Sequence, residues 1–188
     1  MSTARAFVIT GPSGVGKGTL IRGLIERVPG LELSVSATTR GPRPGERDGA
    51  EYHFFTPEQF EQRAREGKFL EHATYSGKRY GTLRSEVLRR LEAGTPVVLE
   101  IEVQGARQVR EALPDAVAVF IAPPSPRALR ERLLRRGTDD VDAVEQRLRT
   151  AQVELQAQPE FAHVIVNDDL EKATEELASI VRRALAAD

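Results

Sequence analysis

The segment from Ala6 to Thr19 constrains the fold most, because an apolar run, a glycine-rich turn and the start of a helix follow one another directly. Residues 6–10 read Ala-Phe-Val-Ile-Thr, which is typical of a buried strand. The next residues, Gly11-Pro-Ser-Gly-Val-Gly-Lys17-Gly-Thr19, contain the pattern Gly-x-x-x-x-Gly-Lys, and apolar residues at helical spacing follow them. Strand, glycine-rich turn and helix in this order predict a phosphate-binding loop.

The chemistry of this loop follows from its residue types. Its glycines let the backbone bend back and expose N–H groups, which together with the positive end of the helix form a concavity for phosphate oxygens. Lys17 adds a positive charge at the phosphate to be transferred. A Ser or Thr hydroxyl that binds magnesium is expected directly after the lysine, but that position is Gly18, and Thr19 comes one place later. The sequence therefore predicts that the usual magnesium hydroxyl is missing or displaced.

Composition restricts the class of protein. A length of 188 residues favours a single domain with room for an inserted flap or two. The net charge of −1 gives no electrostatic reason to expect nucleic acid, and no apolar stretch approaches the ~18 residues that cross a membrane. The N-terminus lacks the pattern of a signal peptide, and the absence of cysteine excludes disulfides and thiolate metal sites. We expect a cytoplasmic enzyme with no nucleic-acid or membrane partner.

The rest of the chain predicts an α/β fold. Strands and helices alternate from residue 85 to residue 187, which implies a parallel sheet covered by helices on both faces, with ligands at the carboxyl ends of the strands. Residues 31–38 alternate apolar and small polar residues and predict one strand. Residues 36–82 contain a Gly- and Pro-rich loop and short strand patterns, so we expect a mostly β flap inserted after the second strand.

The order of several motifs resembles that of the guanylate kinase family, and the resemblance covers nearly the whole chain. It implies a three-layer P-loop sandwich in one domain of residues 1–188, with its core in 1–35, 83–125 and 159–188, a GMP-binding flap in 36–82 and a helical lid in about 126–158. It also implies that ATP phosphorylates GMP, and dGMP, in purine nucleotide metabolism, with Mg²⁺ as cofactor. The motifs are Gly11–Thr19, Ser36-Ala-Thr-Thr-Arg-Gly-Pro-Arg43, Gly49–Tyr52, Phe69–Glu71, Tyr80–Thr82, Glu100–Gly105, Ile121–Ser125, Arg136-Gly137 and Ile165–Asp169.

Two features of the flap have the chemistry of a GMP site. Arg40 and Arg43 lie three residues apart in a Gly- and Pro-rich loop, and the arginine fork binds phosphate in bidentate fashion, although such a loop can also be merely solvated. Glu71 follows two apolar residues. One carboxylate accepts both guanine donors, N1–H and the 2-amino group, whereas adenine presents an acceptor at N1. The resemblance implies a GMP-binding set of Ser36, Arg40, Arg43, Tyr52, Glu71, Tyr80, Thr82 and Glu102.

A pair of glutamates ends a predicted core strand. Glu100 and Glu102 flank Ile101, where charged residues are costly unless they serve a ligand, and alternation places both on one face. The family often carries aspartate at one or both places, so these side chains are longer by a methylene. The resemblance implies that Glu100 helps to hold Mg²⁺ through water and that Glu102 lies near the guanine.

Arginines on two consecutive predicted helices resemble the lid of nucleoside monophosphate kinases. Arg132 and Arg136 are one helical turn apart, and mobile arginines of such a lid close over ATP, neutralise developing charge and exclude water. The resemblance implies a catalytic set of Lys17, Arg40, Arg43, Arg132, Arg136 and Arg147, and an ATP-binding set of Gly11, Pro12, Ser13, Gly14, Val15, Gly16, Lys17, Gly18, Thr19 and Asn167.

Three alternative functions stay open at this point. Gly16-Lys-Gly-Thr19 is similar to the loop of adenylate kinases, which leaves another nucleoside monophosphate kinase as a possibility. A non-catalytic scaffold with a guanylate-kinase-like fold usually lacks an intact phosphate loop, whereas the loop from Gly11 to Lys17 is complete. A nucleic-acid-binding module would use the many arginines, but the near-neutral net charge argues against it.

Overall fold

The computed structural model describes residues 4–135 and 141–187, and its centre is a parallel five-stranded sheet. The strand order is β2-β7-β1-β8-β9, and every neighbouring pair runs parallel, which confirms the predicted core sheet. The strands are β1 (Ala6–Thr10), β2 (Glu32–Leu33), β7 (Val97–Glu100), β8 (Val117–Ala122) and β9 (His163–Val166).

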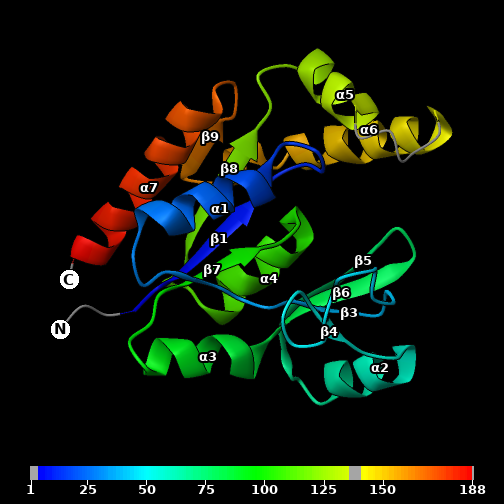
Figure 1. The fold of residues 1–188 in the computed structure, drawn as a ribbon, viewed down its shortest axis with the longest axis vertical. Coiled ribbons are helices and arrows are strands. Elements are labelled where there is room, and N and C mark those ends of the chain that lie inside the picture. Colours follow the sequence, from blue (N-terminus) through cyan, green and yellow to red (C-terminus); the bar gives the residue numbers. More distant parts are fainter. Residues whose placement is uncertain (1–3, 136–140, 188) are drawn as a thin grey trace.

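Helices cover both faces of this sheet (Figure 1). The first face packs against α1 (Lys17–Arg27) and α7 (Leu170–Ala186), and the second packs against α3 (Arg84–Glu92) and α4 (Val103–Ala112). Strand β1 shows the alternation directly, because Phe7 and Ile9 join the cluster on the first face and Val8 joins the cluster on the second. Each such fully buried side chain contributes about 1.5–3 kcal/mol. Together, sheet and helices form a three-layer sandwich.

A second, mixed sheet lies beside the core, in the lower right of Figure 1. Its order is β4-β3-β6-β5, and α2 (Pro57–Arg65) packs on it through Phe60, whose ring stacks on Phe69 at 4.4 Å. Thr56 and Gln59 form a capping box at the start of α2. The strands are β3 (Ala37–Thr38), β4 (His53–Phe54), β5 (Phe69–Tyr75) and β6 (Lys78–Leu83).

The prediction of one strand over residues 31–38 is wrong. The segment contains two short strands, because β2 pairs with β7 in the core sheet and β3 pairs with β4 and β6 in the second sheet. An alternating pattern identifies extended backbone but does not identify the pairing partner. The chain therefore leaves one sheet and enters the other within a single stretch of alternating residues.

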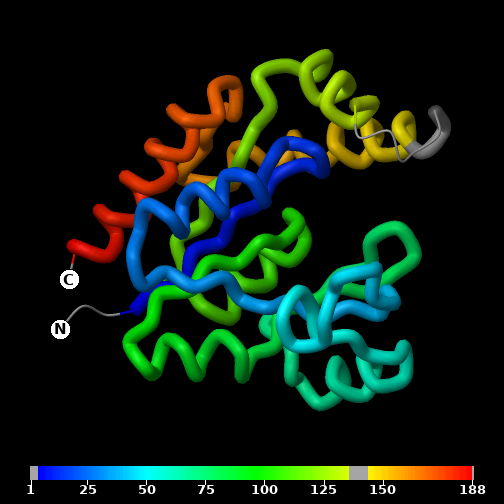
Figure 2. Tube along the Cα trace, in the orientation of Figure 1, coloured from blue at the N-terminus to red at the C-terminus, as the bar shows by residue number. Residues whose placement is uncertain are grey.

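Two helices follow β8 and project from the core at the upper right of Figure 1. They are α5 (Pro126–Arg135) and α6 (Val141–Leu155), which pack together through a cluster that includes Leu129, Leu133 and Ala151. Helix α6 is followed by a 3₁₀ turn, Gln158–Glu160. The chain trace in Figure 2 shows the second sheet and the α5–α6 pair on the same side of the core. No helix within the described ranges is long and apolar enough to cross a membrane.

Candidate active site

The glycine-rich loop between β1 and α1 has the backbone shape that phosphate binding requires. Gly11 and Gly16 have φ angles of 140° and 99°, in the region that favours glycine. A Cβ at Gly11 would lie 2.3 Å from the carbonyl oxygen of Ile121, and one at Gly16 would lie 2.7 Å from Nδ2 of Asn167. The backbone thus packs tightly against β8 and the end of β9, which leaves the N–H groups at the start of α1 to form the anion site.

Lys17 lies within this loop and is only 7% exposed. Its Nζ donates to the carbonyl oxygens of Gly11 at 2.6 Å and Pro12 at 3.3 Å, and it lies 3.8 Å from Oε2 of Glu102. The ammonium group is therefore held over the loop. A phosphate that binds there would replace these neutral carbonyl acceptors with charged oxygens.

Two residues predicted on the ATP side hold the loop from outside. Asn167 donates from Nδ2 to the carbonyl oxygen of Val15 at 2.8 Å. Arg132, on α5, donates to the same oxygen at 3.3 Å and to the carbonyl oxygen of Asn167 at 2.7 Å. Helix α5 is therefore connected to the phosphate loop. Arg147 lies on α6, whereas Arg136 falls outside the described residues.

The guanidinium of Arg40 is fixed by its own loop. Nη1 donates to the carbonyl oxygen of Gly41 at 2.7 Å and to Oε2 of Glu46 at 2.9 Å, while Nη2 donates to Oε1 of Glu46 at 2.9 Å. Among the described residues, these bonds use three of the five N–H groups. The N–H of Nε and the second N–H of Nη2 therefore form an edge that can bind a ligand in bidentate fashion. Glu46 also accepts the backbone N–H of the exposed Arg43 at 2.8 Å. One carboxylate thus joins both predicted clamp arginines.

Two tyrosines lie beside this arginine. The rings of Tyr52 and Tyr80 are 6.3 Å apart, and the Arg40 guanidinium carbon lies 5.1 Å from the centre of the Tyr52 ring. Burial raises the pKa of Tyr52, and the charge of Glu100 adds to that increase. The structure therefore brings together Arg40 from a loop, Tyr52 from the position just before β4, and Tyr80 from the middle of β6.

Glu71 is a buried carboxyl group on β5 with 5% exposure. Thr82 on β6 donates its hydroxyl to Oε1 of Glu71 at 2.7 Å. Burial raises the pKa of Glu71 to about 7, the hydrogen bonds from Thr82 oppose that shift, and the charge of Glu102 adds to it. Glu71, Thr82 and Glu102 thus gather at one place, while Ser36 lies half-buried between β2 and β3.

Gly105, on α4, makes room for this carboxyl group. A Cβ at position 105 would lie 2.4 Å from Oε2 of Glu71, too close for both atoms to stay in place. We expect Gly105→Ala to displace Glu71 and to lower kcat/KM for GMP about 10²-fold, as misplacements of about 1 Å do. Steady-state kinetics measures this loss, and thermal unfolding measures the accompanying change in stability, because overpacking against a buried side chain lowers Tm while the helix preference of alanine partly offsets that cost. Unchanged kinetics would mean that the position of Glu71 is unimportant.

Glu154 and Glu46 are site residues that the sequence analysis missed. Glu154 is the penultimate residue of α6, and its carboxyl group lies against that of Glu102 beside Lys17. Oε2 of each glutamate is buried without a hydrogen-bond partner in the described part of the chain. Burial, followed by the charge of Glu102, raises the pKa of Glu154. One feature of the sequence could have identified Glu154: it lies three residues after Ala151, which places the two on the same buried face of the helix.

The carboxylate chemistry of the site suits a magnesium ion that is already bound to a nucleotide. No three His, Cys, Asp or Glu side chains among the described residues are arranged to hold a metal by themselves. Mg²⁺ usually takes one or two carboxylates together with phosphate oxygens and water. Glu100 meets that need, because its carboxylate lies next to Gly18 at the start of α1.

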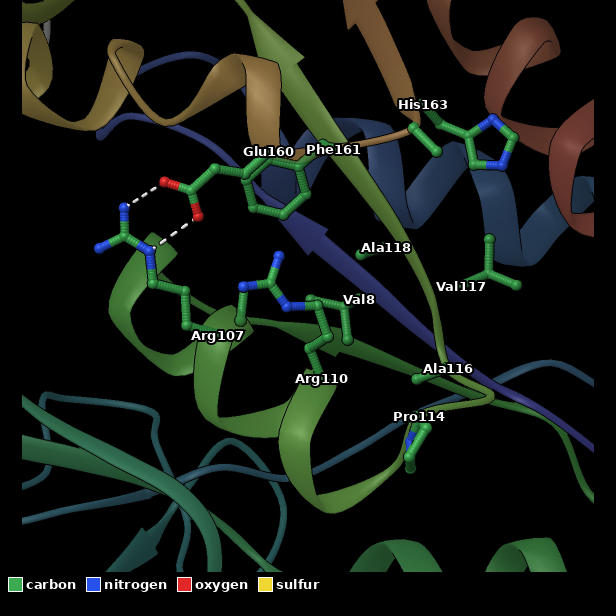
Figure 3. Close-up of a pocket in the computed structure, with 12 residues that line it drawn as sticks. Val8, Arg107, Arg110, Pro114, Ala116, Val117, Ala118, Glu160, Phe161 and His163 are labelled. Carbon is green, nitrogen blue, oxygen red and sulfur yellow. Dashed lines mark hydrogen bonds and ion pairs between the residues drawn. The ribbon is translucent and has the colours of Figure 1, made fainter.

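A cavity of about 320 Å³ lies away from all these residues (Figure 3). It is bordered by α4, by Phe161 and by the first residues of β8 and β9, at the opposite end of these strands from the phosphate loop. The ion pair between Arg107 and Glu160 stands at its edge. None of the predicted site residues lines this cavity.

A lysine-containing glycine loop between the first strand and first helix, on a parallel sheet with helices on both faces, defines a P-loop nucleotide-binding protein. The family model described as guanylate kinase matches residues 3–184. The chain belongs to the guanylate kinase family.

Known guanylate kinases match this chain over nearly its full length. A guanylate kinase from a Synechococcus strain is 54% identical over 94% of this chain and 93% of its own length. One from Rubrobacter xylanophilus is 52% identical over 99% of this chain and 97% of its own length. The crystal structure of guanylate kinase from Anaplasma phagocytophilum superposes with a TM-score of 0.78 at 32% identity, covering 96% of this chain and 86% of the other.

Proposed function

We propose that this chain transfers the γ-phosphoryl group of Mg·ATP to GMP by direct in-line attack, producing ADP and GDP. The observation that carries the proposal is the buried Glu71 carboxyl group, which lies within electrostatic range of Glu102, while Glu102 lies 3.8 Å from Nζ of Lys17 in the phosphate loop. A carboxylate suited to guanine therefore lies close to a lysine suited to a transferring phosphate. The names of the relatives support the same reaction.

The donor side uses charge neutralisation. Lys17 and the backbone N–H groups of the loop bind the ATP phosphates, and Asn167 supports the loop at the nucleotide. Arg132, Arg136 and Arg147 stabilise the loose transition state when the lid closes. Magnesium, when bound through Glu100, supplies further neutralisation of phosphate charge. No covalent intermediate is needed.

The acceptor side fixes the GMP phosphate and base separately. Arg40, Arg43, Tyr52 and Tyr80 hold the phosphate, which attacks the γ-phosphorus of ATP. The base is held by Glu71, which accepts both guanine donors, together with Ser36, Thr82 and Glu102. We also propose dGMP as an acceptor, because the contacts proposed above are to the phosphate and the base, which GMP and dGMP share.

In this proposal, residues 36–82 form a GMP-binding flap and residues 126–158, approximately, form a lid. The remaining residues form the core. Closure of both parts excludes water as a competing acceptor. We therefore expect ATP hydrolysis without GMP to be slow compared with GMP phosphorylation. A turnover assay with and without GMP measures both rates, and equally fast ATP loss without GMP would contradict this gating.

A coupled assay of several nucleotide acceptors with Mg·ATP tests the function itself. GMP should be phosphorylated much faster than AMP, because adenine presents its N1 lone pair to Glu71 and leaves both groups unsatisfied. Faster phosphorylation of AMP would overturn the role of Glu71. Absence of ATP binding by calorimetry would instead favour a non-catalytic scaffold.

The pKa of Glu71, raised to about 7, predicts a pH dependence of GMP recognition. Only the ionised carboxylate accepts two hydrogen bonds from guanine, so the affinity for GMP should increase as pH rises toward that value and then level off. Below it, we expect kcat/KM for GMP to fall about tenfold per pH unit. Titration of GMP itself affects Glu71→Gln equally, so the ratio of wild-type to variant kcat/KM isolates the residue. A ratio independent of pH would contradict this assignment.

A further inference from the structure

Helix α6 brings a carboxyl group into contact with the phosphate loop. Glu154, the penultimate residue of α6, accepts a hydrogen bond from the backbone N–H of Ser13. Figure 1 shows the loop between β1 and α1 beside this end of α6. The side chain of Glu154 also lies within hydrogen-bonding range of the side chain of Glu102, which immediately precedes α4. Glu154 therefore contacts both the donor loop and a residue of the proposed guanine site.

The contact between these two carboxyl groups requires a proton. Oε2 of Glu102 and Oε2 of Glu154 are both buried, and neither has an N–H or hydroxyl partner in the part of the chain that the structure describes. Two carboxylates in contact do not both stay ionised, so a carboxyl proton is the donor that the pair lacks. Burial, followed by the charge of Glu102, raises the pKa of Glu154, which identifies Glu154 as the proton carrier at neutral pH. Neutral Glu154 can thus donate to Glu102 while its carbonyl oxygen accepts from Ser13.

The position of Lys17 indicates what this hydrogen bond restrains. Nζ of Lys17 lies 3.8 Å from Oε2 of Glu102, beyond hydrogen-bonding distance, and donates instead to the carbonyl oxygens of Gly11 at 2.6 Å and Pro12 at 3.3 Å. A carboxylate is a stronger acceptor for an ammonium group than a neutral carbonyl. An unrestrained Glu102 would therefore close on the lysine, and its hydrogen bond with Glu154 accounts for the gap.

We propose that Glu154 is a positioning residue that holds Glu102 away from Lys17. Glu102 then stays on the guanine side, and the ammonium group stays available to the phosphate that is transferred. One hydrogen bond serves both ends of the site, because the same carboxylate would neutralise Lys17 if it were released. This inference rests on the proposed function, which assigns the phosphate to Lys17 and the guanine to Glu102.

Suppression by a second substitution tests this role without a measurement of turnover. Isothermal titration calorimetry measures the Kd of a non-hydrolysable Mg·ATP analogue. Glu154→Ala releases Glu102 to pair with Lys17, so this Kd should increase about tenfold. In a Glu102→Gln background no carboxylate is left at position 102 to pair with the lysine. There, Glu154→Ala should change the Kd less than about twofold.

Two further variants test the nature of the contact. In Glu154→Gln the amide nitrogen can donate to Glu102 and the amide oxygen can accept from Ser13, as in the neutral acid. This variant should recover most of the binding that Glu154→Ala loses. Glu145→Ala removes a different carboxylate of α6, one that pairs with Arg130, and serves as the matched control with an unchanged Kd.

Three results would overturn the proposal. The first is an unchanged Kd in Glu154→Ala. The second is an equal loss of binding in both backgrounds together with a lower Tm, which would show that Glu154 only supports the fold. The third is a loss in Glu154→Gln as large as in Glu154→Ala, because the carboxylate charge would then be needed. Failure of the proposed function would look different, since the wild-type chain itself would neither bind the analogue nor phosphorylate GMP.

Discussion

Replacement of Lys17 by alanine is expected to lower kcat for GMP phosphorylation about 10²–10³-fold, the usual effect of removing one charged or hydrogen-bonding group that stabilises a transition state. The ammonium group lies inside the phosphate loop, held by the carbonyl oxygens of Gly11 and Pro12. In the loose transition state of phosphoryl transfer, charge builds on oxygens that the enzyme must neutralise. Arg40 is paired with Glu46 in the loop of the second sheet, and Arg132 donates to the backbone carbonyl oxygens of Val15 and Asn167, so neither replaces an ammonium group inside the loop.

The expected loss must be separated from a loss of folding. Lys17 is buried, so alanine removes packing by its aliphatic stem as well as its charge. Lys17→Met keeps most of that stem and should lose as much turnover as Lys17→Ala. A loss of about 1 kcal/mol would lower Tm by about 2–4 °C for a chain of this size. Full turnover in Lys17→Met would show that the charge has no catalytic role.

Replacement of Glu71 by glutamine is expected to reduce the preference for guanine. The amide oxygen still accepts one donor, but the amide nitrogen meets the second guanine donor without an acceptor. Loss of a hydrogen bond to a charged group is worth about 1.5–3 kcal/mol, which corresponds to about 10–10²-fold in kcat/KM for GMP. The same amide nitrogen can donate to N1 of adenine, so AMP should become a better acceptor.

Comparison of GMP, IMP and AMP as acceptors measures this change. IMP lacks the 2-amino group, so the wild-type chain should discriminate against it, and Glu71→Gln should treat GMP and IMP more alike. Thr82 can still donate to the amide oxygen, so the side chain should stay in place. The KM for ATP serves as the control. If the order of preference among GMP, IMP and AMP were unchanged, Glu71 would have no role in base selection.

Local patterns accounted for most elements of the fold. The apolar run at residues 6–10 and the helical spacing that follows the glycine-rich turn are short-range signals, and they produced the expected strand β1 and helix α1. The error at residues 31–38 arose because pairing is long-range. Residue 33 pairs with Val98, whereas residue 37 pairs with Gly81 in a different sheet.

The site was predictable only in part, for a similar reason. Motif order and the family resemblance identified the loop, the arginines and Glu71 as candidates. Glu46 and Glu154 carry no motif of their own, and their importance comes from contacts with Arg40 and Glu102 that sequence spacing does not reveal. Their chemistry depends on which side chains meet in three dimensions.

The phosphate loop, the alternation of strands and helices, and the family were predictable from local patterns, because each depends on residues close together in the chain or on motif order. Three contacts became known only from the folded chain: Glu100 lies beside Gly18, Glu71 lies against Gly105, and Arg40 is hydrogen-bonded to Glu46. The physical reason is that burial and charge interactions depend on distances through space, and parallel strands bring residues far apart in the chain to a common edge.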